Sequence, residues 1–206
     1  SFEDSFNTSL GWTTAVVNCP SFPTPTGQWV RMNPNGTLLQ PENDSPDDIG
    51  AQCYVTGDAG PGGNFAAADV DGGPMRLTSP AISLLGDDVR VRYSVWQYTI
   101  LYNPGQEDFL LVEASDNGFT WTPIETVSSK GPKWIESGFR VGDFFPGADL
   151  LVIRFTSSDC PNDGVTESAV DNIRVAALSC DECPSASTPL AEAPVLLKNR
   201  YISFVP

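Results

Sequence analysis

Alternation of apolar and polar side chains is the clearest pattern in the second half of the chain. From residue 89 to residue 95, valine or tyrosine recurs at every second position, and arginine, serine or another aromatic residue occupies the alternate positions up to residue 98. A period of two residues places the two sets on opposite faces of a β-strand, so one face is expected to meet the core. The core set is Val89, Val91, Tyr93 and Val95, and the opposite set is Arg90, Arg92, Ser94, Trp96 and Tyr98.

Further strands follow at regular spacing, separated by turn residues. Asn117-Gly118 is typical of a hairpin turn. Helical periodicity is nearly absent and strands do not alternate with helices, so the sheets are expected to be antiparallel. The predicted strands are residues 12–17, 28–31, 52–56, 75–78, 89–98, 109–115, 120–127, 134–141, 149–157 and 168–177.

These strands predict an all-β fold over residues 1–178, an antiparallel β-sandwich of the jelly-roll type. The loops before residue 69 are long, and such loops usually carry function or are held by a ligand or disulfide. Residues 179–194 have the composition of an acidic linker with cysteine and proline. Residues 195–206 have a strand-like pattern that either begins a following domain, which we favour, or folds back onto the module.

Composition narrows the class of protein. The chain has 206 residues, of which 40% are hydrophobic, and it contains 18 Gly and 18 Pro, which suits many strands joined by tight turns. The net charge of -15 argues against nucleic acid or an anionic membrane as partner. No apolar run is long enough for a membrane span, so no membrane insertion is expected. We expect a secreted or cell-surface protein, and a mature chain or excised domain beginning at Ser1.

The five cysteines leave at least one thiol unpaired or paired outside this chain. Cys180 and Cys183 form a C-x-x-C spacing, for which we favour a local disulfide over a metal site or two thiols. Cys19 and Cys53 either bridge the N-terminal region or remain separate. Because the chain contains no histidine, a structural zinc site would need four of the cysteines.

Asp69-Val70-Asp71-Gly72 places two carboxylates one residue apart in a glycine-rich turn. Alternate side-chain oxygens can point inward, and glycine lets the backbone bend so that its carbonyls join them. These are the ligands that Ca²⁺ prefers. The stretch therefore predicts a calcium-binding loop.

Several short motifs occur in an order that resembles a known group of modules. Individually weak, together they resemble MAM-like jelly-roll modules and carbohydrate-binding modules of bacterial secreted multidomain proteins. The resemblance implies a jelly roll, often with a structural cation, a binding or accessory role, and no catalytic residues. The motifs are Phe2-Glu3 with Gly11-Trp12, Asp69 to Pro80, Ser115 to Trp121, Trp134, Ile153-Arg154-Phe155 and Ser168 to Ile173.

A jelly roll brings the N-terminal strand beside the last strand, which predicts one calcium site. It would be formed by Glu3, Asp69, Asp71 and Asp171, with loop carbonyls completing the shell. Carboxylates without lysine neighbours repel one another unless a cation lies among them. The alternative is that these residues form turns and strand ends and accept hydrogen bonds from backbone amides.

The polar face of residues 89–98 is a second candidate site. Arg92, Trp96 and Tyr98, with Tyr102 in the following loop, combine aromatic planes with a charged group, as sugar-binding sites do. Glu113 and Arg154 are expected on neighbouring strands of the same sheet. The alternative is a covered face in which Arg92, Glu113 and Arg154 form a structural ion network, and Phe109 and Leu111 on that face favour it. Trp12, Trp121 and Trp134 are expected to pack in the core or at the sandwich edge.

The sequence offers little for catalysis, since it lacks histidine, a nucleophile-elbow motif and a phosphate loop. We therefore expect a protein that is not an enzyme. The first interpretation is a calcium-stabilised extracellular binding, adhesion or accessory module of a larger secreted protein, with a polysaccharide or another extracellular protein as partner. The alternatives are a carbohydrate-binding module and an accessory domain of a secreted peptidase or glycosidase.

Overall fold

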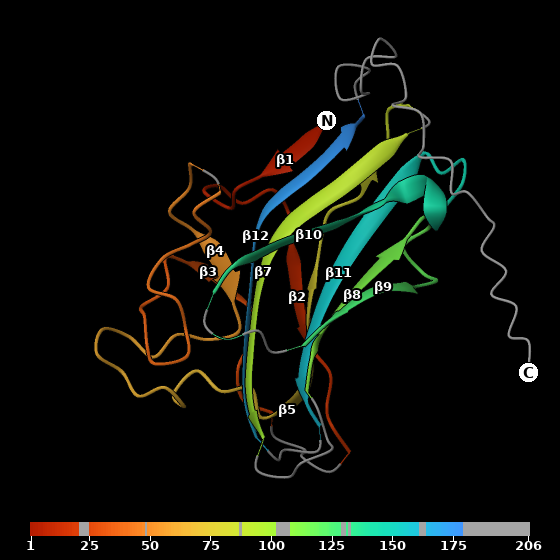
Figure 1. Ribbon diagram of the computed structural model, residues 1–206. Coiled ribbons are helices and arrows are strands. Elements are labelled where there is room, and N and C mark those ends of the chain that lie inside the picture. The colour runs from red at the N-terminus through yellow and green to blue at the C-terminus, as the bar shows by residue number, and fades with distance from the viewer. Residues whose placement is uncertain are drawn as a thin grey trace, which may run out of the picture.

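The chain folds into two six-stranded antiparallel sheets packed face to face (Figure 1). The computed structural model describes residues 1–20, 25–47, 49–86, 88–101, 108–128, 131, 133–160 and 164–178. Sheet A has the order β10 (Ile135–Arg140), β7 (Val89–Leu101), β12 (Gly164–Ala177), β4 (Cys53–Val55) and β3 (Val30–Met32), with β1 (Phe2–Asp4) also on β12. Sheet B has the order β2 (Thr13–Val16), β5 (Gly72–Thr78), β11 (Leu150–Asp159), β8 (Leu110–Ser115) and β9 (Thr122–Val127), with β6 (Ile82–Ser83) on β11.

The predicted β-sandwich is confirmed, and the side chains of β7 that were expected to face the core do so. Val91, Tyr93 and Val95 are almost completely buried between the sheets, where the ring of Tyr93 meets that of Phe155 on β11 edge to face. A 3-10 turn, η1 (Val141–Asp143), follows β10. The pattern did not reveal β6, since two residues are too few to show a period of two.

The N-terminal strand β1 pairs with the last strand β12, as the jelly-roll expectation required. Glu3 lies opposite Arg174, and Asp4 lies opposite Ile173. Asp4 turns toward the core, where its carboxylate accepts hydrogen bonds from the backbone N–H of Phe6 and the indole N–H of Trp12, both at 2.8 Å. Glu3 is exposed on the other face of the sheet.

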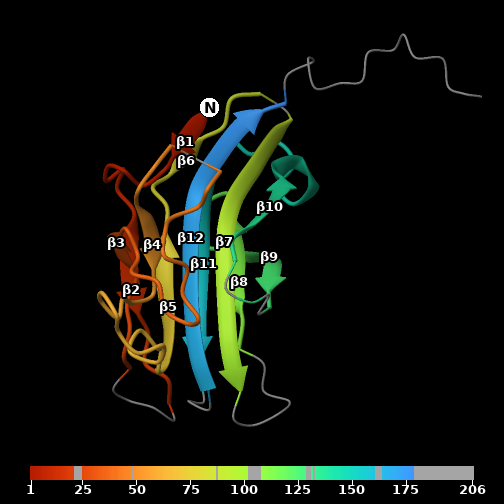
Figure 2. The ribbon, with the colours of Figure 1, turned by 60° about the vertical axis from the view of Figure 1, so that its left-hand side comes forward.

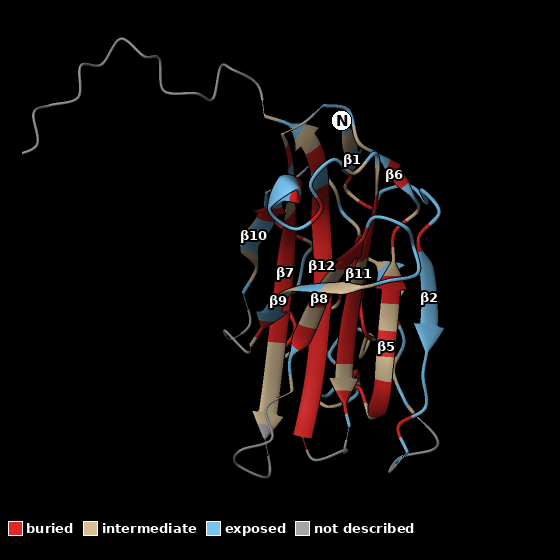
Figure 3. Ribbon diagram, turned by 90° about the vertical axis from the view of Figure 1, so that its right-hand side faces the viewer, coloured by how far each residue is buried: buried red, intermediate tan, exposed pale blue. Residues whose placement is uncertain are grey.

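Residues 38–47 cover the middle of the outer face of sheet A, beside β4 and β12 (Figure 2). The backbone N–H of Ser45 donates to Asp171 of β12, and its hydroxyl donates to Ser94 of β7, each at 2.9 Å. Trp134 donates its indole N–H to the carbonyl of Asn43. Strand β12 is therefore buried over most of its length (Figure 3).

The linker predicted over 179–194, the strand predicted over 195–206, and the Cys180–Cys183 pair all lie outside the described residues. In the part of the chain that is described, no helix is long and apolar enough to cross a membrane.

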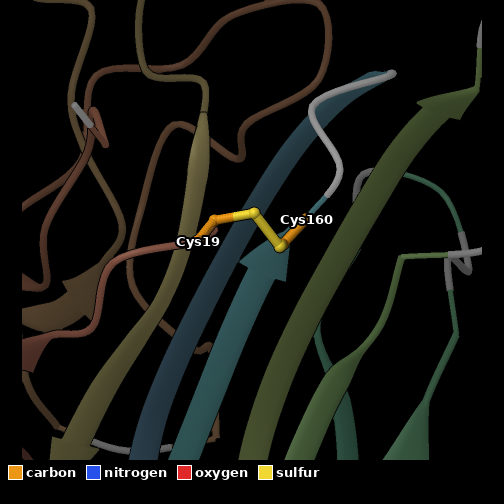
Figure 4. Close-up of a disulfide and its surroundings, with 2 residues drawn as sticks. All are labelled: Cys19 and Cys160. Carbon is orange, nitrogen blue, oxygen red and sulfur yellow. A yellow bond between two sulfur atoms is a disulfide. The ribbon is translucent and has the colours of Figure 1, made fainter. Parts of the chain in front are cut away.

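A disulfide joins Cys19, just after β2, to Cys160 at the end of β11 (Figure 4). The predicted Cys19–Cys53 alternative is therefore wrong. Cys53 is buried in β4, in a cluster with Trp96 and Ala169 on the outer side of sheet A. Because the two bonded cysteines are 141 residues apart, the bridge closes most of the module into one loop. No local pattern could have identified this pairing.

Replacing both bonded cysteines, Cys19→Ser with Cys160→Ser, should lower the free energy of unfolding by about 3–5 kcal/mol, because the unfolded chain regains the entropy of a long open loop. Urea unfolding followed by tryptophan fluorescence measures the change. Cys180→Ser with Cys183→Ser is the matched control and should leave the midpoint unchanged. An unchanged midpoint in the first variant would contradict the stabilising role of the bridge.

Candidate functional site

The four carboxylates of the predicted calcium site do not converge. Asp69 accepts a hydrogen bond from the backbone N–H of Thr166 at 2.6 Å, near the start of β12, and Asp71 accepts one from the hydroxyl of Thr26 at 2.6 Å. Glu3 lies opposite Arg174, near the other end of β12. The eight residue steps from Thr166 to Arg174 span roughly 25 Å of extended strand. Glu3, Asp69, Asp71 and Asp171 therefore cannot share one ion.

Asp171 lies between these ends and already has partners. It is fully buried and accepts hydrogen bonds from the backbone N–H groups of Ser45, at 2.9 Å, and Asn172, at 2.7 Å. The prediction that the four carboxylates form one calcium site is therefore wrong. The alternative holds for Asp69 and Asp171, whose carboxylates accept hydrogen bonds from backbone amides. Within the described residues, no three or more His, Cys, Asp or Glu side chains lie close enough together to hold a metal ion.

The end of β12 near Asp69 nevertheless concentrates negative charge. Burial raises the pKa of Asp69 to about 7, and the nearby carboxylates of Asp71 and Asp159 add to the rise. Burial also raises the pKa of Glu167 to about 8, with a further contribution from Asp69. Glu167 is only 1% exposed, and neither of its carboxylate oxygens has a hydrogen-bond partner among the described residues.

The predicted aromatic site on β7 does not form. Trp96 is 1% exposed and packs in the outer cluster of sheet A, and Tyr98 is partly buried against the same cluster. Arg92 lines a separate groove with Glu3 and Arg174. Tyr102 lies outside the described residues. The covered-face alternative is right for Trp96, but the side chains that cover it are those of the apolar outer cluster and not an ion network.

Glu113 and Arg154 lie on sheet B and not beside β7, which corrects the second half of that prediction. They face each other across β8 and β11 and form a two-pronged ion pair, with guanidinium-to-carboxylate distances of 2.8 and 2.9 Å. The hydroxyl of Thr156 donates to the same carboxylate at 3.2 Å. Consecutive strands β7 and β8 enter different sheets, so their side chains never share a face.

The aromatic residue beside this ion pair is Trp121. The guanidinium carbon of Arg154 lies 3.9 Å from the centroid of the Trp121 ring, a cation–π contact. We call Trp121, Glu113, Arg154 and Thr156 the sheet B platform. Trp121 is partly exposed, whereas Arg154 and Glu113 each retain 12% of their side-chain exposure. The ion pair therefore restrains the Arg154 guanidinium beneath the indole ring.

A bulge explains why Trp121 is not a core residue. Val112 pairs with Glu125, but Glu113 pairs with Pro123, so β9 has one extra residue at Ile124. One inserted residue moves all preceding side chains to the opposite face. Counting by twos from the buried Val127 would place Trp121 in the core, and only the bulge places it outside. The sequence carries no clear signal for this bulge.

Arg76 extends the platform toward β5. It lies opposite Thr156 in the strand register, and its Nε atom is buried without a hydrogen-bond partner among the described residues. The outer face of sheet B thus combines one aromatic ring with donors and acceptors on adjacent strands.

Ionisation of Glu167 should make stability fall as pH rises. An acid with a raised pKa in the folded state stabilises the fold while protonated, and this contribution is lost as pH rises through about 8. With EDTA present, Glu167→Gln should match the wild type at pH 4 and exceed its free energy of unfolding at pH 8.5 by about 2–4 kcal/mol. Urea unfolding across this pH range measures the difference.

The matched control is Glu136→Gln, an exposed carboxylate on β10. Its free energy of unfolding should change with pH as that of the wild type does. Parallel pH curves for Glu167→Gln and the wild type would contradict a buried carboxyl group that ionises unfavourably.

Comparison with known proteins supports the fold. No family model and no curated protein matches the chain. The K2 adhesin domain of Lys-gingipain is similar, with 15% identity and a TM-score of 0.51, over 85% of this chain and 97% of that one. TmCBM61, solved with β-1,4-galactotriose, has 10% identity and a TM-score of 0.50, over 82% and 90%. The K1 adhesin domain of Lys-gingipain from Porphyromonas gingivalis W83 has 14% identity and a TM-score of 0.49, over 86% and 98%. At these identities the two matches with TM-scores of 0.50 and 0.51 support the β-sandwich fold and nothing beyond the fold.

Proposed function

We propose that the protein is a non-catalytic, secreted or cell-surface carbohydrate-binding module that grips a polysaccharide on the sheet B platform. The observation that carries the proposal is the stacking of Trp121 on an Arg154 guanidinium held by Glu113. A rigid indole ring offers an apolar face to the C–H groups of a sugar ring. The charged groups around it offer hydrogen bonds to sugar hydroxyls.

The ion pair makes the platform selective for neutral sugars. Arg154 and Glu113 neutralise each other, so neither attracts a charged ligand strongly, while both retain donor or acceptor capacity for hydroxyl groups. Adhesin and carbohydrate-binding domains share this fold, and one of them was solved with a β-1,4-linked galactose trimer. These similarities support a binding role within a larger protein. The proposal thus takes the carbohydrate-binding alternative from the sequence as the specific form of the broader binding or accessory role expected first.

Calcium remains part of the proposal, restricted to Asp69 and Asp71. These carboxylates lie close enough to raise the pKa of Asp69, and the unpartnered Glu167 adds to the same negative field. A divalent cation there would relieve the repulsion, with backbone carbonyls and water completing its coordination. It would also hold the 57–71 loop against the start of β12.

Trp121→Ala should weaken binding of a neutral oligosaccharide about tenfold or more, because it removes the stacking surface. A glycan array that includes β-1,4-galactotriose identifies the best ligand, and isothermal titration calorimetry measures the affinity. Trp134→Ala is the matched control, a partly exposed tryptophan on sheet A that should leave binding unchanged. The proposal fails if no neutral glycan binds, or if both variants bind like the wild type.

Removing calcium with EGTA should lower the thermal midpoint by roughly 5–10 °C relative to a calcium concentration a hundred times Kd, because bound ligand stabilises only the folded state. Differential scanning calorimetry measures the shift. Asp69→Asn with Asp71→Asn should abolish the response, whereas Asp116→Asn, in an exposed hairpin turn, should retain it. An unchanged wild-type midpoint in EGTA would end the calcium proposal.

A further inference from the structure

Three arginines line one small groove on the outer face of sheet A. The groove lies at the end of the sheet where β1 pairs with β12 (Figure 1), and residues 38–47 reach its edge through the carbonyl of Asp47, which accepts a hydrogen bond from Arg174. Its volume is about 190 Å³, and Ala176 and Leu178 complete its wall. We call Arg90, Arg92, Arg174 and Glu3 the arginine groove. It is separate from the sheet B platform, which lies on the opposite outer face of the sandwich.

The arginines concentrate positive charge in a strongly acidic protein. The chain has 11 Lys and Arg residues against 26 Asp and Glu, yet three of the 11 meet here. Arg92 on β7 lies directly opposite Arg174 on β12 in the strand register. Like charges directly opposite each other destabilise a sheet. Because this pair lowers the stability of the sheet, we infer that it serves another role.

The acidic neighbours leave this charge largely uncompensated. Within the described residues the ion pairs are Arg140–Asp88 and Arg154–Glu113, and neither includes a groove arginine. Glu3 lies across from Arg174 in the register but forms no ion pair with it. Arg140 on β10 lies opposite Arg90 on β7 and forms an ion pair with Asp88. An arginine on this face is thus neutralised when a carboxylate is within reach.

Arg174 is held in place by neutral groups. Its Nε donates to the side-chain oxygen of Asn172 at 2.9 Å, and one terminal nitrogen donates to the carbonyl of Asp47 at 3.0 Å. Asn172 has a positive φ of 53°, within the bulge that brings Arg174 opposite Arg92. These contacts orient the guanidinium and leave its charge in place, and its remaining donors can serve a ligand.

We propose that the arginine groove binds the carboxylate of an acidic sugar residue. Two guanidinium planes on adjacent strands match the two oxygens of a carboxylate, which accept parallel hydrogen bonds. The groove is smaller than sites that enclose a whole ligand, so it suits one anionic group of an extended chain. The carboxylate recognition rests on the groove alone, whereas the choice of a saccharide rests on the proposed function.

Calorimetry on the full chain with trigalacturonate and its fully methyl-esterified form tests the proposal. The free acid should bind at least tenfold more tightly than the ester, and inorganic sulfate should compete with it. Arg92→Gln with Arg174→Gln should reduce affinity for the acid at least tenfold, while Trp121→Ala should leave it unchanged. Arg140→Gln, on the same face but already paired with Asp88, is the matched control and should bind like the wild type.

Equal affinity for the acid and its ester would overturn the proposal, as would an Arg92→Gln, Arg174→Gln variant that binds like the wild type. Equal loss in Arg140→Gln would assign the effect to general surface charge and would overturn it too. Loss of acid binding in Trp121→Ala would place the acidic sugar on the sheet B platform instead. Failure of the neutral-glycan experiment alone would leave the groove result intact, so the two proposals fail separately.

Discussion

Burial of β12 on both faces is the constraint on which the rest of this structure depends. Its inward side chains, such as Val170 and Ile173, lie in the core between the sheets, and its outward residues Ala169 and Asp171 lie under other parts of the chain. Three parts of the chain attach to this strand at different positions along its length. Asp69 bonds near its start, residues 45–47 bond along its middle, and β1 pairs near its end. Strand β12 pairs with β7 along nearly its whole length. The positions of these attachments along β12 are therefore fixed relative to one another.

The covering of sheet A decides where a ligand can approach. Since Trp96 lies beneath the outer cluster, its indole is unavailable for stacking, although its position on the strand alone suggested otherwise. The two proposed binding surfaces lie in two different places. The sheet B platform presents a neutral ion pair under Trp121, and the arginine groove presents positive charge at the end of sheet A where β1 pairs with β12. A ligand that distinguishes these places does so by its charge.

Buried acids form the third element of the architecture. Glu167 and Asp69 lie where the long loop returns to the sandwich, and the same burial that fixes the loop makes their ionisation unfavourable. Under the calcium proposal, protons at low pH or a cation at higher pH would neutralise these groups and stabilise the loop. The Cys19–Cys160 bridge restrains the same end of the sandwich by a covalent route that is insensitive to pH.

The sequence by itself determined the local features. A period of two residues identifies strands and the faces of β7, so the β-sandwich, most strand positions and the inward set around Tyr93 were predictable. Only the tertiary structure decided which sheet Arg154 joins, which face residues 38–47 cover, which cysteine meets Cys19, and on which side of β9 Trp121 lies. The physical reason is the sequence separation between the residues that interact. Alternation arises from neighbouring residues, whereas pairing partners lie tens of residues apart or more, and a one-residue bulge reverses a face without changing composition.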